Sequence, residues 1–489
     1  MSKNILEERG LFWWHDEPIP ENQFAPDNCV AGTLTIAADG AASLDLDGYL
    51  ANEHEHGLQH FFADQSKVFP PDKAIQGKLK GGKKNDVLLF KLRKDGSSFS
   101  TNGMSHERYV ANASLVAQGS LPTAKQSLRF ASLNIELKGL EQWLRLGNIH
   151  VTRSRTCVSA KYRKPKDDVY MLTDGTLAMS YVAMGLWPGN KRIAYREDEL
   201  NLVERVVLRY RPKKRRSLEE MIEEYGRIQE LFILLTGSEY AIEWPWLTIG
   251  KMSYELYFRG HPRSTEEPPK THECWTNFIQ LRTVFGALFD TWRRKREELG
   301  PGVYLYLGLR RGMKMFIEHR FVNLIWGLES LHRRKSVDTK AVEKIKKKIE
   351  RILTQVKAQK DRRWLEGRLK NAAEPSLKER LADIFSELPL EFDPKALDTF
   401  CQECANRRND VSHFGGVRTG TSYTDFVIDL DKKSSALEIL YHIALLREIG
   451  VASEVLKAHV MSSPSVFYLR QLGLLPQPAL PLPSEHGHG

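Results

Sequence analysis

The spacing of hydrophobic positions along this chain changes near residue 212. Before that point, short apolar runs alternate with polar residues and end at Gly, Pro, Asn or clusters of Lys and Arg. The runs Gly32–Ile36 and Ser43–Leu46 alternate in this way, and Asp39-Gly40 between them is a favoured hairpin turn. Further runs of the strand type are Val87–Phe90, Leu133–Leu137 and Leu202–Leu208. The pattern predicts a β-rich domain over residues 1–212.

Beyond the basic run Arg209–Arg216, apolar residues recur at three- and four-residue steps, which is the spacing of an amphipathic helix. Ser217-Leu218-Glu219-Glu220 forms a capping box at the start of the first helix, and Gly237 ends it. A second helix is predicted from about Trp275 to Leu299, ahead of a boundary at Gly300-Pro301-Gly302.

Four long helices and one short helix are predicted after that boundary. The long ones span about 313–334, about 338–357, the stretch from Asp393-Pro394 to Gly415-Gly416, and about 434–460, while the short one follows Ser376. Four such helices predict a bundle. The expected fold class is therefore α+β and multidomain: a β-rich N-terminal domain (1–212), a helical connector (213–300), a four-helix bundle (301–460) and a Pro-rich mobile tail (461–489).

The composition narrows the class of protein only slightly. At 489 residues the chain is too long to fold around one hydrophobic core. Its 41% hydrophobic and 27% charged residues are ordinary for a soluble globular chain. A net charge of +10 favours polyanionic partners. No apolar run has the length of a membrane span, and residues 1–10 lack the apolar core of a secretory signal. Five cysteines, an odd number, indicate free thiols in a reducing cytoplasm.

Candidate chemistry is concentrated in Arg408-Asn409-Asp410-Val411-Ser412-His413, called the Arg-Asn-His segment below, where the third long helix ends. On a regular helix, Asn409 and His413 are one turn apart on the polar face, and Arg408 lies roughly 140° from His413. The length of the arginine side chain allows it to cover that angle. A guanidinium stays charged and matches phosphate geometry, while an imidazole titrates near neutrality. This set suits an RNA phosphodiester, whose own 2′-hydroxyl attacks, so the chemistry requires no metal and no cofactor.

A structural interpretation competes with the chemical one. Arg and His at a helix C-terminus interact favourably with the negative end of the helix dipole, and such a pair by itself usually has no catalytic meaning. The neighbouring Asn409, the double glycine that follows and the four-helix context favour a functional role.

With these features the chain resembles the HEPN ribonuclease superfamily, whose members carry Arg, a polar residue, three or four further residues and His on one helix of a four-helix bundle. Leu328-Glu329-Ser330-Leu331-His332 on the first bundle helix is similar to a Leu-Glu segment of that superfamily. A β-rich domain ahead of the bundle, with Trp13-Trp14 and Leu140–Trp143 as looser matches, is similar to the ApeA family of antiphage defence proteins.

The resemblance implies metal-independent endoribonuclease cleavage that leaves a cyclic phosphate. His413 would be the general acid or base, a task worth about 10²-fold to 10⁴-fold, and Arg408 would hold the phosphate and stabilise the transition state. Asn409 would orient His413 or the ribose, and Asp410 would set the imidazole tautomer. Glu329 would either complete this polar cluster or pair with a nearby Lys or Arg on the surface. Members of the superfamily usually join two such motifs across a dimer.

Basic residues near the segment are candidate RNA contacts, namely Arg407, Arg333 and Arg334. Longer basic runs at 209–216 and 344–351 could form a track for an RNA backbone. Long helices commonly expose Lys and Arg that nearby Glu residues balance, so we interpret most of these runs as solvated surfaces.

Other motifs predict no additional chemistry. Gly77–Lys84 imitates a phosphate-binding loop, but a lysine ends it where Ser or Thr must hold magnesium, which indicates a basic surface loop. Cys401 and Cys404 have no second pair at zinc spacing and are interpreted as buried thiols. Three histidines between residues 54 and 60 match no standard ligand pattern, so no metal site is predicted.

The sequence thus leads to one main hypothesis and two alternatives. The main one is a cytoplasmic RNA-cleaving effector of antiphage defence, of the abortive-infection type, that works as a homodimer or higher homo-oligomer. Its β-rich domain would sense a phage-derived activator or hold the bundle inactive. The first alternative keeps the fold as a non-catalytic nucleic-acid-binding or oligomerisation module. A DNA-directed nuclease is disfavoured because two-metal cleavage needs several convergent carboxylates, for which the sequence shows no suitable cluster.

Overall fold

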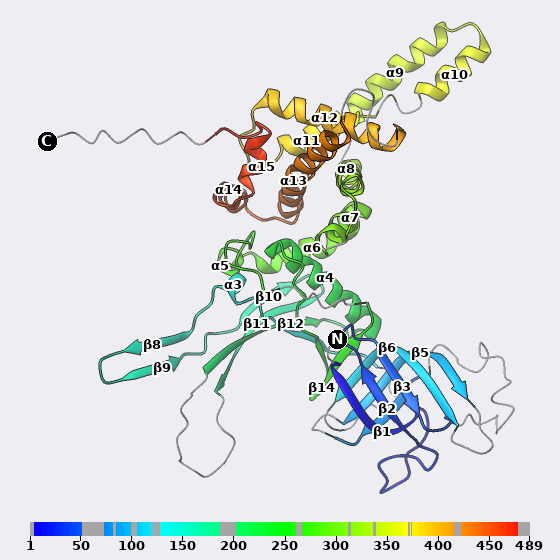
Figure 1. Ribbon diagram of the computed structural model, residues 1–489, viewed down its shortest axis with the longest axis vertical. Helices are drawn as coiled ribbons and strands as arrows, with labels where there is room; N and C mark the ends of the chain where they lie inside the picture. Colours follow the sequence, from blue (N-terminus) through cyan, green and yellow to red (C-terminus); the bar gives the residue numbers. More distant parts are fainter. Residues whose placement is uncertain are drawn as a thin grey trace. The chain divides into compact units, whose positions relative to one another are not determined.

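The computed structural model describes residues 4–50, 73–81, 85–98, 105–117, 119, 121, 128–185, 202–260, 267–311, 314–335, 339–369, 372, 374–414 and 422–477. Two compact units make up the chain: Met1–Gln229 with Tyr240–Pro268, and Glu230–Glu239 with Pro269–Gly489. Figure 1 shows that the labelled strands belong to the first part of the chain and most helices to the second. The predicted α+β class with a β-rich N-terminal region is confirmed.

Six strands of the first unit close into an antiparallel barrel. They are β1 (Leu6–Trp14), β2 (Val30–Ile36), β3 (Ala42–Leu46), β4 (Ile75–Leu79), β5 (Asp86–Ser98) and β6 (His106–Ala117). Their order is β6-β3-β2-β1-β4-β5, and the ring closes because β5 also pairs with β6. Alternate residues such as Phe12, Leu34 and Leu44 fill the barrel core. The predicted hairpin is confirmed, since β2 pairs with β3 and Gly40 adopts a φ of 80° in the turn.

The same sheet continues from β6 into an open part. Its strands follow in the order β14 (Met252–Phe258), β13 (Trp246–Ile249), β7 (Ser132–Glu136), β12 (Leu202–Pro212), β11 (Gly175–Gly185) and β10 (Asp168–Leu172). Strands β5 and β12 contain two of the further runs that the sequence predicted as strands, and β7 covers the third up to Glu136. A separate two-stranded ribbon consists of β8 (Ile149–Arg153) and β9 (Val158–Tyr162), and the short helix α3 (Glu141–Leu144) precedes it.

Strands β13 and β14 differ from the expectation that helices dominate after residue 212. They form a hairpin in which Ile249 faces Met252 across Gly250, whose φ is 59°. β13 pairs with β7 and β14 pairs with β6, so both strands complete a sheet whose other members come much earlier in the chain. The alternation of the two strands was short, and this long-range pairing decided their conformation.

Helix α4 (Leu218–Thr236) confirms the capping box that the sequence predicted. The Ser217 backbone N–H donates to the Glu220 carboxylate at 2.7 Å, and the Glu220 N–H donates to the Ser217 hydroxyl at 3.3 Å. Gly237 follows the helix with a φ of 67°. Because the apolar positions of α4 are buried, the predicted amphipathic face is confirmed as well.

Helices form the second unit. They are α5 (Phe278–Leu281), α6 (Phe285–Leu299), α7 (Pro301–Arg310), α8 (Ile317–Arg334), α9 (Thr339–Gln355), α10 (Gln359–Leu369), α11 (Leu377–Ser386), α12 (Pro394–Phe414), α13 (Tyr423–Glu448), α14 (Ser453–Ser462) and α15 (Val466–Gln471). Helix α8 contacts α11, α12 and α13, and α11 also contacts α12 and α13. These four helices are the bundle.

The membership of the bundle differs from the sequence prediction. A helix was expected at 338–357 as one of four bundle members, and α9 does occupy that stretch. However, α9 contacts α10, and its Ile345 and Ile352 are 40% and 38% exposed. The fourth place belongs to the shorter α11, whose Leu381, Ile384 and Phe385 are buried. An apolar stripe alone therefore did not reveal which helix reaches the core.

Two predictions near the C-terminus were also wrong. The helix predicted at 434–460 is interrupted at Gly450, which has a φ of 97° and separates α13 from α14. The tail predicted from Met461 contains α15, which ends at Gln471. Leu469 within this helix and Leu474 after it are fully buried. Apolar residues between the prolines dock this stretch onto the unit.

Candidate active site

Helix α12 carries the Arg-Asn-His segment in its last turns. It begins as the sequence predicted, because the Asp393 carboxylate accepts a hydrogen bond from the Ala396 N–H at 2.8 Å and Pro394 is the first helical residue. Cys401 and Cys404 are fully buried, which confirms their interpretation as buried thiols. Burial raises the pKa of Cys401 to about 12, so this thiol stays protonated at neutral pH.

The two adjacent arginines of α12 have different surroundings. The Arg407 guanidinium donates to the Asp429 carboxylate of α13 at 2.6 Å and lies 5.2 Å from the centre of the Phe426 ring. It also pairs with Asp410 at 3.5 Å. Arg407, which the sequence predicted as a candidate RNA contact, is thus bound to the neighbouring helix α13.

Arg408 has no carboxylate partner within the described part of the chain. Its Nη1 donates to the Asn409 side-chain oxygen at 3.3 Å, and its Nε is buried without a hydrogen-bond partner among the described residues. Asn409 and Arg408 are both half-buried. A half-buried guanidinium without a counter-charge is poised to accept an anion, since burial of an unpaired charge is costly.

His413 lies on the last turn of α12, four residues after Asn409. Both residues belong to one continuous helix, so they occupy the same helix face, as the sequence predicted. The side chain of His413 and the Gly415-Gly416 pair fall outside the described residues. The register of α12 relates His413 to Arg408.

Asp410 lies three residues after Arg407 on α12. It is only 5% exposed, and the charge that neutralises it comes from Arg407. Next to this pair, Asp429 also binds Lys433, which in turn binds Glu403 of α12 at 3.0 Å. Burial acts to raise the pKa of Asp429, but hydrogen bonds from Lys433 and Arg407 hold it below its ordinary value. Asp410 thus joins a charged seam between α12 and α13.

The other predicted residues lie on α8. Glu329 pairs with Arg333 at 3.0 Å, one turn along the same helix, and Arg333 also binds Glu374 at 3.1 Å. Arg334 donates to the Glu298 carbonyl oxygen at 3.2 Å. Among the described residues, neither hydrogen bonds nor ion pairs link Glu329, Arg333 or Arg334 to the Arg-Asn-His segment. Glu329 forms the kind of ion pair that the structural alternative expected.

Sequence reasoning missed a buried polar cluster around His442 of α13. The His442 Nε2–H donates to the Leu234 carbonyl oxygen at 2.8 Å, so its Nδ1 accepts from the Tyr306 hydroxyl at 2.6 Å. The Trp275 ring stacks on His442 at 4.2 Å between centroids and also lies 4.6 Å from the His459 ring. Burial, followed by the Arg310 charge, lowers the pKa of His442 well below its ordinary value. A histidine inside an apolar run, Leu440–Leu446, was the signal in the sequence.

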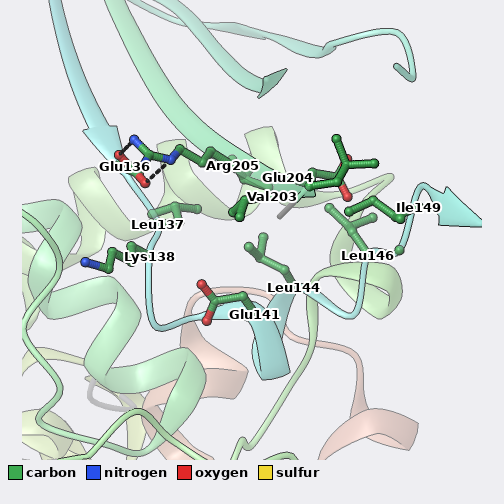
Figure 2. Close-up of a pocket in the computed structure, with 13 residues that line it drawn as sticks. Glu136, Leu137, Lys138, Glu141, Leu144, Leu146, Ile149, Val203, Glu204 and Arg205 are labelled. Carbon is green, nitrogen blue, oxygen red and sulfur yellow. Dashed lines mark hydrogen bonds and ion pairs between the residues drawn. The ribbon is translucent and has the colours of Figure 1, made fainter. Parts of the chain in front are cut away.

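The first unit contains a cavity of about 410 Å³, shown in Figure 2. Leu137, Leu144, Leu146 and Val203 contribute apolar walls. Its charged residues are occupied by other protein groups: Arg205 binds Glu136 at 3.4 Å, and Glu204 accepts from the Asn148 side chain at 2.6 Å. Because Arg205 and Glu204 are already bound to other protein groups, this cavity does not indicate a catalytic site.

The structure bears differently on the phosphate-loop-like stretch Gly77–Lys84 and on the histidines between residues 54 and 60. The first part of Gly77–Lys84 is strand β4 of the barrel, and not a surface loop, and Lys78 binds Asp86 at 2.9 Å. The histidines between residues 54 and 60 lie outside the described residues. Over the described ranges, no group of three His, Cys, Asp or Glu residues could hold a metal ion. A search of the same ranges found no helix with the length and apolar character needed to cross a membrane.

A four-helix bundle with Arg, Asn, three residues and His at the end of one helix defines a domain of the HEPN class. Two family models match the chain: Apea-like HEPN over residues 322–455, and ApeA N-terminal domain 1 over residues 7–292. The second match covers more than half of the sequence, so the chain belongs to the ApeA family. Comparisons with curated proteins and with solved structures gave no match. HEPN domains are generally ribonucleases that dimerise, and the domain pair supports a HEPN-type defence effector.

Proposed function

We propose that this chain is an endoribonuclease effector of antiphage defence, of the abortive-infection type, and that Arg408, Asn409 and His413 carry out the cleavage. The observation that carries the proposal is the difference between the two arginines. Arg407 is neutralised by Asp429 and Asp410, whereas Arg408, on the same turn, has no carboxylate partner among the described residues. An uncompensated guanidinium beside an amide is suited to a phosphodiester.

The proposed roles follow from side-chain chemistry. His413 takes the proton from the RNA 2′-hydroxyl or gives one to the leaving 5′-oxygen. Arg408 binds the scissile phosphate and stabilises the charge that develops on it. Asn409, which already accepts from Arg408, fixes that guanidinium and orients the ribose or His413. The products are a 2′,3′-cyclic phosphate and a 5′-hydroxyl, and the reaction needs no metal.

The proposal includes a second copy of the chain. Two Arg-Asn-His segments meet across a HEPN dimer, and the first unit receives a phage-derived activator in the cytoplasm. Asp410 supports the site by fixing Arg407, because the pair between α12 and α13 holds the end of α12 in place. Glu329 remains a candidate for the polar cluster only if its pair with Arg333 opens.

Substitution of the segment tests the proposal directly. We expect Arg408→Ala and His413→Ala each to reduce RNA cleavage in EDTA by at least about 10²-fold, since each removes a group used in the transition state. The assay uses the full chain, total cellular RNA and, if the purified protein is silent, lysate of infected cells. Product ends are identified by whether phosphatase alone or a cyclic-phosphate-opening enzyme exposes the 3′-hydroxyl.

A matched control removes one charge from a helix outside the bundle. Arg363 on α10 is exposed and forms no ion pair with the described residues, so Arg363→Ala should cleave as the wild type does. If His413→Ala cleaves as fast as Arg363→Ala, the catalytic assignment is wrong. Intact RNA binding without any cleavage, with or without infected lysate, would instead favour the non-catalytic module.

A further inference from the structure

The two-stranded ribbon of the first unit and its flanking residues carry exposed cations without any acidic residue among them. Figure 1 shows β8 and β9 extending as a ribbon separate from the large sheet. This basic ribbon, residues 149–166, contains no Asp or Glu and six cations: Arg153, Arg155, Lys161, Arg163, Lys164 and Lys166. All six are exposed. Among the described residues, Lys164 alone of them has an ion-pair partner, Asp167 at 3.9 Å.

The two faces of the ribbon differ in chemistry. The antiparallel register pairs His150 with Lys161 and Thr152 with Ser159, so these four hydrogen-bonding side chains share one face. The other face carries Ile149, Val151 and Arg153 opposite Tyr162, Ala160 and Val158. One face therefore presents only groups that bind phosphate oxygens or base edges.

The base of the ribbon is fastened to the large sheet. The Asn148 side chain and its backbone N–H both donate to the Glu204 carboxylate of β12, at 2.6 and 3.3 Å. The Arg163 N–H donates to the Asn148 carbonyl oxygen at 3.3 Å, which closes the ribbon at the same point. Figure 2 shows Glu204 and Ile149, the first residue of β8, beside each other at the cavity. The strands are thus held at one end, and their cations are placed before any partner arrives.

We propose that the basic ribbon binds duplex DNA, with its hydrogen-bonding face in the major groove and its flanking cations on the phosphates. The major groove of B-form DNA accepts a two-stranded β-ribbon. The deep, narrow major groove of A-form RNA does not admit side chains in this way. Proteins that bind single strands supply aromatic stacking platforms, whereas the single Phe, Tyr or Trp of the ribbon, Tyr162, is half-buried.

This surface goes beyond the proposed ribonuclease site, because it belongs to the other unit and uses none of the Arg-Asn-His residues. It also differs from the RNA contacts that the sequence suggested on the bundle helices. The candidates on the bundle, Arg333 and Arg407, are bound to carboxylates, whereas Arg153, Arg155 and Lys161 have no ion-pair partner among the described residues.

The test measures DNA binding by the full-length chain as fluorescence anisotropy of a labelled duplex of about 20 base pairs. The ribbon variant combines Arg153→Gln, Arg155→Gln and Lys161→Gln. We expect it to raise the Kd for duplex DNA about tenfold or more, and to make the slope of log K against log salt less negative by roughly 2–3, since each lost phosphate contact removes about 0.9.

A matched variant keeps the net charge equal. Lys344→Gln, Lys347→Gln and Lys348→Gln on α9 also remove three exposed cations, and this variant should bind DNA as the wild type does. Thermal unfolding followed by circular dichroism should be unchanged in both variants, because none of the six side chains is buried. Equal loss of affinity in the two variants would overturn the proposal, since net charge would then explain the binding.

Competition experiments with unlabelled nucleic acids and vesicles identify the class of ligand. Unlabelled duplex DNA should displace the probe at lower concentration than duplex RNA of the same sequence, single-stranded RNA or vesicles rich in phosphatidylserine. Stronger competition by either RNA or by the vesicles would contradict the proposal, and so would undiminished binding by the ribbon variant. Arg408→Ala should bind DNA as the wild type does, so failure of this inference and failure of the ribonuclease proposal remain distinguishable.

Discussion

At the scale of single residues, the sequence and the tertiary structure distinguish Arg407 from Arg408 of α12 in different ways. The spacing to His413 favoured Arg408 over Arg407, yet both are arginines on the same helical turn. The Asp429 and Phe426 contacts of Arg407 come from packing of α12 on α13, whereas its Asp410 pair lies within α12. The helix periodicity of α12 could not show them, because Asp429 and Phe426 belong to another element.

The two arginines should differ in their effect on stability. Arg407→Ala removes a positive charge that pairs with the 5%-exposed Asp410 and with Asp429, and we expect it to lower the free energy of unfolding by about 1–3 kcal/mol. Arg408→Ala removes no ion pair among the described residues and should change it by less than about 0.5 kcal/mol. Urea unfolding of the full chain, followed by far-ultraviolet circular dichroism, measures both. A larger loss for Arg408→Ala would contradict the assignment of roles.

At the scale of elements, the existence of helices and strands was easier to predict than their packing. The capping box at Ser217, the helix start at Ser376 and the Asp393-Pro394 start are local signals, and each is confirmed. The bundle membership of α11 in place of α9 is not local, since it depends on which apolar face finds partners. The same holds for His442, whose partners Tyr306 and Leu234 lie on α7 and α4.

Burial of neutral His442, which is hydrogen-bonded to residues of α4 and α7, gives the protein a pH dependence. The pKa of His442 is lowered in the folded chain, so between that value and the ordinary 6.5 the unfolded chain binds more protons. Stability therefore falls as the pH drops below 6.5, by up to about 1.4 kcal/mol per pH unit. Urea unfolding at pH 7.5, about 6.5 and about 5.5 should show this loss, above the range in which carboxylates titrate.

His442→Gln removes the titrating ring and should flatten the dependence between these pH values. It should also lower stability at pH 7.5, since the Tyr306 hydroxyl loses its acceptor at the cost of about 1–3 kcal/mol. The pH dependence of stability that remains in this variant is assigned to His459, because burial lowers the pKa of His459 to about 4. His272→Gln, at an exposed side chain, is the matched control. An unchanged slope in His442→Gln would show that another group dominates.

At the scale of the whole molecule, the chain consists of two units whose boundaries are not simple in sequence. Residues Glu230–Glu239 belong to the helical unit, although the hairpin β13–β14 that follows them belongs to the other. The domain limits drawn at 212 and 300 from composition stay predictions, whereas the tail drawn from 461 contains α15. The reactive assembly is proposed to be larger still, because HEPN domains dimerise.

If two copies of the Arg-Asn-His segment form one reactive unit, the purified protein should have twice the 56.1 kDa mass of one chain by light scattering. Mixing with catalytically dead chains gives a sharper test. After subunit exchange with an equal amount of His413→Ala chains, cleavage should be about a quarter of that given by wild-type protein at the same total chain concentration, because only homodimers of wild-type chains act. A fall to about one half would mean that each chain carries a complete site.

The sequence by itself determined the strand-rich and helix-rich parts, the caps of α4, α11 and α12, and the order of Arg408, Asn409 and His413 on one helix. These depend on periodicity and on contacts within a few residues, which the order of amino acids specifies directly. Only the tertiary structure decided that the barrel closes through β5 and β6, that α11 enters the bundle, that Arg407 is neutralised while Arg408 is not, and that His442 is buried. Each of these depends on residues far apart in the chain that meet only when the apolar faces pack.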